Sequence, residues 1–286
     1  MSIQKNISME RSIVSTPSFG DIAFSEEGTG PAALFIHGIF LNADLWAHQV
    51  TALAGLRRCI AVDLLAHGMS PCPSGHLTIG VQAQMVVEFL DALDLEQVDV
   101  VGNDTGGAIC QILAATYPDR IRSMTLTNSD VHDNFPPEAF LPVKDLATQG
   151  FLAEGLSALA GDPAGIRGAL ATSFEEVDAI ADETLLGFFK TFANVENATA
   201  LQDYIAGMEP SETVAIEQSL SAFAAPTLIV WATDDVFFPV KWADWLESTI
   251  PGVIRSVRVE GARLFFPLER PEALVDELRQ FWSALQ

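Results

Sequence analysis

Residues 98–107 read Val-Asp-Val-Val-Gly-Asn-Asp-Thr-Gly-Gly and lead into the apolar run Ala-Ile-Cys-Gln-Ile-Leu at 108–113. The β-branched run predicts a buried strand, and the apolar run that follows predicts a helix. Between them, glycines at positions 102, 106 and 107 permit a sharp turn in which two backbone segments approach closely. A turn of this kind lifts one side chain above the sheet, and here that side chain belongs to Asp104. The stretch therefore predicts an α/β fold with a carboxyl group at a strand-to-helix turn.

The chain on both sides of this stretch alternates strands with helices. Predicted strands lie at 11–15, 21–25, 32–36, 59–62, 98–101, 124–127, 227–231 and 256–259. Further helices are predicted at 45–53, 78–93, 242–246 and 271–285, with Thr78 as the N-cap of the second. Alternation of this kind requires right-handed crossovers, which build a mostly parallel sheet with helices on both faces. We expect about eight strands, of which the first two form a hairpin.

The alternation stops between residues 133 and 220. This segment reads as short helices that are broken by glycines and prolines and that carry large apolar side chains. We interpret it as a helical cap at 133–220, inserted into an α/β core made of residues 1–132 and 221–286. Such a cap would cover the carboxyl ends of the strands, where α/β sheets bind ligands.

Composition excludes several classes of partner. The formal net charge is −23, so nucleic acid and anionic membrane surfaces would be repelled at long range. The three cysteines are odd in number and lack the spacing of a zinc site, so neither a disulfide framework nor a structural zinc site is indicated and a reducing cytoplasm is favoured. We expect no metal and no cofactor. No apolar run is long enough to span a membrane. The expected partner is a small apolar molecule, and the oligomeric state stays open.

Six motifs together resemble those of the α/β-hydrolase superfamily, and most closely its haloalkane dehalogenase and epoxide hydrolase branch. They are F-I-H-G at 35–38, V-D-L-L-A-H-G-M-S at 62–70, V-G-N-D-T-G-G at 101–107, Y-P-D-R-I at 117–121, W-A-T-D-D-V-F-F-P at 231–239 and F-P-L-E-R-P-E at 266–272. The resemblance covers the chain apart from the predicted cap. It implies that the turn at Asp104 is the family's nucleophile elbow, which carries serine in other branches and aspartate in this one.

The resemblance also implies roles for the neighbouring residues. Asp104 would be the nucleophile, although an aspartate in this place also suits a plain helix N-cap. The backbone amides of Ile39 and Thr105 would form the oxyanion hole. The supporting acid would be Asp235, after the seventh strand, or Asp130, after the sixth, and either residue also suits an ordinary turn. An aspartate nucleophile is suited to attack at saturated carbon, because it forms an alkyl ester that water can later cleave.

The chain departs from the family pattern where the general-base histidine belongs. The pattern E-G-x-G-H-F corresponds here to E-G-A-R-L-F at 260–265, so Leu264 stands in place of the histidine. His132, just beyond the sixth strand, is a candidate replacement, or else an ordinary loop histidine. Without an imidazole, the ester would be hydrolysed slowly or not at all.

The family's leaving-group contacts are also altered. Dehalogenases of the branch hold the leaving halide with a tryptophan that follows the nucleophile and a second donor that follows the His-Gly dipeptide. This chain has Thr105 and Ile39 at those two positions. Epoxide hydrolases use two cap tyrosines, and the predicted cap has only Tyr204.

An apolar pocket is predicted from Phe40, Phe135, Phe238, Trp242 and Leu264. Three functions stay open: a hydrolase that uses Asp104 on a small or medium apolar substrate, a lyase, isomerase or cyclase that uses Asp104 as acid or base, and a binding protein that has lost turnover.

Overall fold

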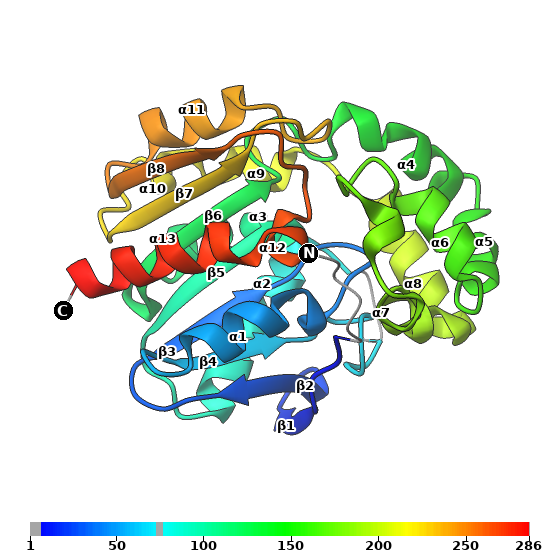
Figure 1. Ribbon diagram of the computed structural model, residues 1–286, viewed down its shortest axis with the longest axis horizontal. Helices are drawn as coiled ribbons and strands as arrows, with labels where there is room; N and C mark the ends of the chain where they lie inside the picture. Colours follow the sequence, from blue (N-terminus) through cyan, green and yellow to red (C-terminus); the bar gives the residue numbers. More distant parts are fainter. Residues whose placement is uncertain (1–6, 73–76, 286) are drawn as a thin grey trace.

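A central sheet of eight strands organises the computed structural model, which describes residues 7–72 and 77–285 (Figure 1). The strand order is β1-β2-β4-β3-β5-β6-β7-β8; β2 runs antiparallel to its two neighbours and the other pairs are parallel. The predicted α/β-hydrolase topology is confirmed. The strands are β1 Ser12–Thr16, β2 Gly20–Glu27, β3 Ala32–Ile36, β4 Arg58–Val62, β5 Val98–Asp104, β6 Ile121–Ser129, β7 Thr227–Ala232 and β8 Val253–Val259.

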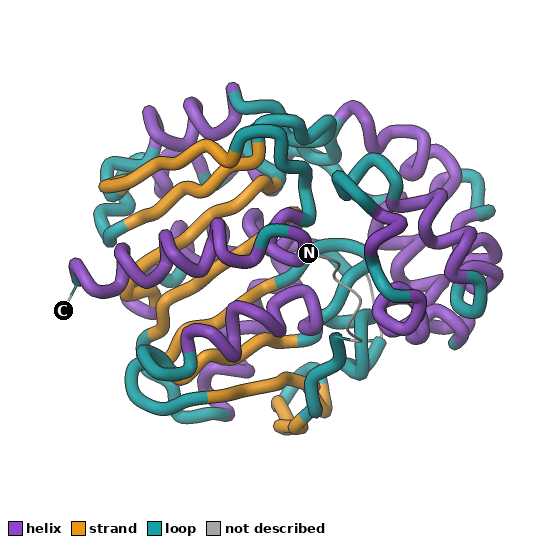
Figure 2. The backbone as a smooth tube through the Cα atoms, viewed as in Figure 1, coloured by secondary structure: helices purple, strands orange, loops and turns teal. Residues whose placement is uncertain are grey.

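Helices cover both faces of this sheet (Figures 1 and 2). The helices α1 and α13 pack together on one face, and α2 and α3 pack together on the other. Thr78 caps α2 as predicted, since its hydroxyl accepts a hydrogen bond from the Val81 amide at 3.2 Å. Among the described residues, no helix is both long and apolar enough to cross a membrane. These core helices are α1 Ala47–Leu53, α2 Ile79–Ala92, α3 Thr105–Thr116, α11 Lys241–Thr249, α12 Phe266–Glu269 and α13 Pro271–Ala284.

The parallel register brings the functional loops to one edge of the sheet. Every residue of β3 and β7 is buried, as expected for strands that are covered on both faces. In the β5–β6 pair, Asp104 lies opposite Ser129, so Asp130 follows directly at the same carboxyl edge. The edge strand β8 begins at Val253, three residues earlier than predicted. Its start was missed because its first residues are partly or fully exposed and Arg255 interrupts the apolar residues.

The insertion between β6 and β7 is helical and lies beyond the carboxyl ends of these strands (Figure 1). Its last helix, α10, packs against α3 of the core. The division of the chain at residues 133 and 220 stays a prediction. The helices of the insertion are α4 Leu141–Thr148, α5 Leu152–Leu159, α6 Pro163–Leu170, α7 Asp182–Phe189, α8 Val195–Ala206, α9 Ser211–Ala215 and α10 Glu217–Leu220, with short 3-10 turns between them.

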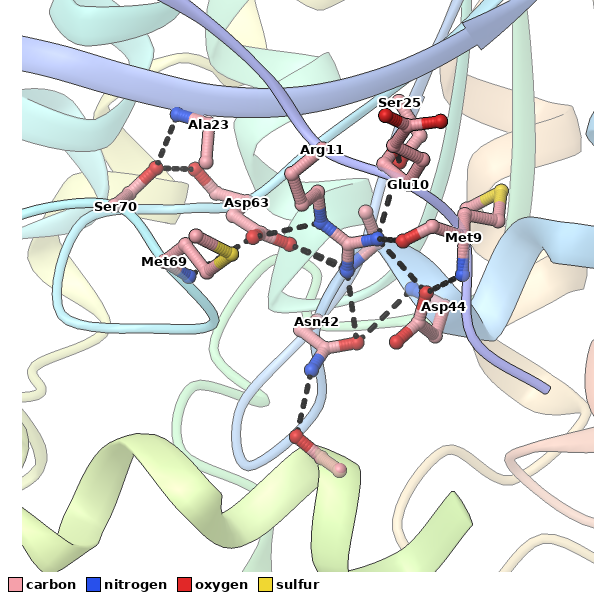
Figure 3. Close-up of polar contacts among 12 residues, drawn as sticks. Met9, Glu10, Arg11, Ala23, Ser25, Asn42, Asp44, Asp63, Met69 and Ser70 are labelled. Atoms are coloured by element: carbon pink, nitrogen blue, oxygen red, sulfur yellow. Dashed lines mark hydrogen bonds and ion pairs between the residues drawn. The ribbon is translucent and has the colours of Figure 1, made fainter. Parts of the chain in front are cut away.

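Buried polar contacts centred on Arg11 join four distant segments (Figure 3). The guanidinium donates to Asp63 from Nε at 3.0 Å and to Asp44 from Nη1 at 2.8 Å. Asp63 also accepts from the Ala43 amide at 2.8 Å, and Asn42 donates to the Gly187 carbonyl of α7 at 3.0 Å. The contacts therefore hold the loop after β3 between the core and the insertion.

Candidate active site

The backbone at Asp104 has the geometry of a strained elbow. Asp104 ends β5 and precedes α3, with φ 57° and ψ −132°, a conformation that is rare outside glycine. Gly106 makes this turn possible, because a Cβ atom there would lie 2.2 Å from the Ile36 carbonyl oxygen. The predicted sharp turn is thus confirmed, and Asp104 makes no capping hydrogen bond through its side chain to α3.

The loop after β3 supplies an amide to the Asp104 carboxyl group. The Ile39 N–H donates to Asp104 Oδ2 at 2.9 Å. Gly38 allows this approach, since a Cβ atom there would lie 2.2 Å from the same oxygen. The neighbouring His37 ring is fully buried and supports the loop: its Nε2 accepts from the Leu64 amide at 3.0 Å, which leaves Nδ1 to donate to the Gly38 carbonyl at 2.7 Å.

Opposing effects set the acidity of Asp104. Burial raises the pKa of this carboxyl group to about 7, and the nearby Asp235 adds to the increase. The backbone amides of Ile39 and Thr105 act in the opposite direction, because they stabilise the ionised form. Near neutral pH the protonated and ionised forms of Asp104 are therefore both well populated.

Asp130 is a second buried carboxyl group beside Asp104. Its Oδ2 accepts a hydrogen bond from the Thr105 hydroxyl at 3.0 Å. Its Oδ1 is buried and has no hydrogen-bond partner among the described residues. Burial first, and then the charge of Asp104, raise the pKa of Asp130 well above its usual range. Asp130 therefore favours the protonated form.

Asp235 is the third buried carboxyl group of the region. Its Oδ1 accepts from the Phe237 amide at 2.8 Å, while its Oδ2 is buried without a partner in the described part of the chain. Burial raises the pKa of Asp235 to about 6. A buried carboxylate oxygen without a partner is uncommon in folded proteins.

A cavity of about 160 Å³ lies in front of Asp104. Its wall is mostly apolar, and both the core and the insertion contribute to it. Its lining residues are Ile39, Phe40, Asp104, Thr105, Asp130, Pro137, Ala139, Phe140, Val143, Ala169, Leu170, Thr172, Ser173, Met208, Phe237, Phe238, Leu264 and Phe265.

The cavity brings together much of the predicted site but not all of it. Asp104, Asp130, Ile39 and Thr105 line it, as do three of the residues that we expected to bind substrate, Phe40, Phe238 and Leu264. Phe135 and Trp242 are buried elsewhere, and Asp235 does not reach the wall. The expectation that Phe135 and Trp242 contact a ligand is therefore not supported by their position.

His132 is not among the residues that line the cavity. Its φ of 53° turns the chain so that the ring stacks on Trp245, with centroids 5.0 Å apart, and its Nδ1 contacts the Glu217 carboxylate. Among the described residues that line the cavity there is no histidine. His132 does not line this cavity, and its role as a replacement base stays a prediction.

Most of the cavity-lining residues that the insertion contributes were not predicted from the sequence. Phe140, Val143, Leu170 and Met208 come from short helices and turns whose apolar residues resemble ordinary core. Ser173 adds a polar group that no motif indicated. The breaks at glycine and proline located the insertion, but only its packing decides which side chains face Asp104.

The family described as alpha/beta hydrolase fold matches residues 31–271, and the chain belongs to that family. It is similar to haloalkane dehalogenase 2 of Mycobacterium tuberculosis, with 28% identity over 272 residues that cover 90% of each chain. It is also similar to the 2-hydroxymuconate semialdehyde hydrolase of Pseudomonas sp. (strain CF600), with 29% identity over 246 residues and 77% of each chain. The solved haloalkane dehalogenase DatA from Agrobacterium tumefaciens C58 has the same fold, with a TM-score of 0.81 and 24% identity over 97% of each chain.

Proposed function

We propose that the protein is an enzyme in which the Asp104 carboxylate attacks a saturated carbon atom of a small apolar electrophile. The observation that carries this proposal is the Ile39 amide on Asp104 Oδ2, at the wall of an apolar cavity. With Oδ2 held, Oδ1 is the oxygen available for attack. The similarity to a haloalkane dehalogenase supports the same chemistry.

The reaction begins with a displacement. Asp104 Oδ1 forms a bond to the substrate carbon, the bond from that carbon to the leaving group breaks, and the leaving group departs with the electron pair. The product is an alkyl ester of Asp104. When water attacks the ester carbonyl, negative charge develops on an oxygen that the Ile39 and Thr105 amides would stabilise.

Release of the product is the slow half of this reaction. Leu264 stands where the resemblance implies the general base, and it is a buried apolar side chain on the cavity wall. Its carbonyl accepts a hydrogen bond from the Asn103 side chain at 3.1 Å, so the segment is well anchored. With no imidazole among the described residues that line the cavity, the ester of Asp104 should accumulate.

A second candidate is acid–base catalysis by Asp104 without covalent chemistry. It is favoured by the position of Asp104 on a mostly apolar cavity wall, where burial raises its pKa to about 7, so that the group can serve as proton donor or acceptor near neutral pH. An isomerase or lyase of this kind would form no ester and would need no histidine.

Intact-mass spectrometry separates these functions. After incubation with n-butyl bromide, the proposed nucleophile should carry one butyl group, and Asp104→Asn should carry none. Turnover of n-butyl bromide without a persistent adduct would show that a base elsewhere in the chain activates water. Neither adduct nor turnover with n-butyl bromide and a panel of short alkyl halides would contradict the nucleophile and leave acid–base catalysis or ligand binding.

A further inference from the structure

The cavity contains a second carboxyl group that the proposed displacement does not use. Asp130 follows Ser129, which lies opposite Asp104 in the β5–β6 pair, so the two aspartates lie at the same edge of the sheet. Both line the cavity. Asp130 is only 2% exposed, and its Oδ1 finds no partner among the described residues.

We propose that Asp130 donates a proton to the leaving atom of the substrate while Asp104 attacks the adjacent carbon. The inference rests on the proposed function and narrows its substrate class to electrophiles with an oxygen leaving atom, such as oxiranes. A bromide ion leaves without a proton, whereas a ring oxygen that departs as an alkoxide is strongly basic and benefits from general acid catalysis.

The surroundings of the two carboxyl groups give them different protonation states. Asp104 receives backbone amides that favour its ionised form, whereas Asp130 receives one hydroxyl donor, from Thr105. In a region with little solvent, two adjacent carboxyl groups do not both ionise readily, so the one with more donors ionises first. The pair therefore provides an ionised nucleophile at Asp104 and a neutral acid at Asp130.

The cavity wall fits an oxygen leaving atom better than a halide. Halide sites of the related dehalogenases use indole donors, and no tryptophan lines this cavity in the described part of the chain. Tyr204 is a rival proton donor, because its hydroxyl is buried and lacks a partner among the described residues. Burial first, and then the charge of the nearby Asp130, raise the pKa of Tyr204 well above its usual value. However, Tyr204 does not line the cavity.

The step is balanced in atoms and electrons. The bond from Asp104 Oδ1 to the ring carbon forms as the bond from carbon to the ring oxygen breaks. The ring oxygen keeps that electron pair and takes the proton of Asp130, which gives a hydroxyalkyl ester on Asp104 and a carboxylate at Asp130. Solvent water then returns a proton to Asp130.

Two probes of equal carbon chain length test whether Asp130 is the proton donor. The rates at which n-butyl bromide and butylene oxide add mass to the protein are compared in wild type, Asp130→Asn and Tyr204→Phe. Asp130→Asn should lower the ratio of the oxide rate to the bromide rate about 10²-fold or more, because only the oxide needs a proton for its leaving atom. Tyr204→Phe should leave the ratio of the two rates at its wild-type value.

The pH dependence provides a readout that a structural role would not change. Labelling by butylene oxide should rise with pH as Asp104 ionises and fall at higher pH as Asp130 ionises, whereas labelling by n-butyl bromide should only rise. Thr105→Val removes the hydroxyl that favours ionised Asp130, so the falling limb should move to higher pH. This variant keeps the backbone amide of residue 105.

Other results would overturn the proposal. Equal slowing of both probes by Asp130→Asn would mean that Asp130 acts through Asp104, and selective loss of oxide labelling in Tyr204→Phe would assign the proton to Tyr204. If wild type is labelled by the bromide but not by the oxide, the proton donor is wrong and the nucleophile stands. If neither probe labels wild type, the proposed nucleophile itself fails.

Discussion

Asp104 combines three features that rarely occur together in one residue: a positive φ, a carboxyl group whose pKa is raised by burial to about 7, and an amide donor aimed at one of its oxygens. Each has a separate origin in the sequence. The glycines around it permit the backbone conformation, and the H-G dipeptide at 37–38 allows the loop that carries Ile39 to approach.

The protonation of Asp104 sets the pH dependence of labelling. Burial raises its pKa to about 7, and only the ionised form attacks carbon. Labelling by n-butyl bromide should therefore rise about tenfold per pH unit below pH 6 and level off above about pH 8. This pH dependence is measured as the initial rate at which the protein gains mass at each pH. A labelling rate that falls as the pH rises would contradict attack by the carboxylate.

Leu264 accounts for the slow second half of the proposed reaction. Leu264→His should introduce an imidazole near the cavity, where the buried Oδ2 of Asp235 lacks a partner among the described residues. We expect hydrolysis of the Asp104 ester to accelerate about 10²–10⁴-fold, so that butanol appears over many turnovers. Leu264→Gln, which is polar but not basic, is the control and should keep the adduct. A lasting butyl adduct in Leu264→His would contradict this account of the site.

At the residue scale, the sequence predicted positions that follow from local motifs. Asp104, Asp130, Ile39 and Thr105 lie on the cavity because strand ends and the turn after β3 meet at one edge of a parallel sheet. The stacking of the His132 ring on Trp245 of α11 could not be predicted, because this contact between distant residues has no local signal.

The elbow between β5 and α3 is the element on which the site depends. Gly106→Ala would place a methyl group 2.2 Å from the Ile36 carbonyl oxygen, and backbone atoms cannot move aside easily. We expect a loss of about 1–3 kcal/mol or more in the free energy of unfolding, together with loss of labelling at Asp104. Urea denaturation and intact-mass spectrometry measure the two effects.

A glycine in the insertion provides the matched control for this element. Gly168 lies inside α6, and a Cβ atom there would meet nothing within 4 Å. Gly168→Ala should therefore stabilise the protein by about 0.5–1 kcal/mol, because alanine favours the helix. Equal stability changes at positions 106 and 168 would contradict the tight packing of the elbow.

Elements with a strong pattern were predicted more accurately than elements without one. The buried parallel strands and α2 were placed within a few residues, because their apolar periods are clear and Thr78 marks the start of the helix. The start of β8 and the individual helices of the insertion were not resolved, because edge strands and short helices take their stability from tertiary packing.

At the scale of the whole molecule, Arg11 connects the N-terminal segment, the loop after β3 and the end of β4 (Figure 3). Arg11→Met would leave Asp44 and Asp63 buried without their cation. We expect the free energy of unfolding to fall by about 3–5 kcal/mol. Labelling at Asp104 should also slow, because the loop that carries Ile39 loses its anchor.

Arg279→Met is the control for the loss of an arginine. Arg279 is exposed on α13, and its carboxylate partner Asp276 is exposed as well. The substitution should therefore change the free energy of unfolding by no more than about 1 kcal/mol. Urea denaturation of the two variants provides the comparison. If Arg11→Met is no less stable than Arg279→Met, the buried contacts around Arg11 do not hold the molecule together.

The claim on which this account depends is that Asp104 is the nucleophile, and locating a covalent label tests it most directly. Wild-type protein and Asp104→Asn are incubated with n-butyl bromide, digested and sequenced by tandem mass spectrometry. We predict one butyl ester, on Asp104, and no label in the peptide from Asp104→Asn. A butyl group on Asp130 or Asp235 with Asp104 unmodified, or equal labelling of the Asp104→Asn variant, would contradict the account.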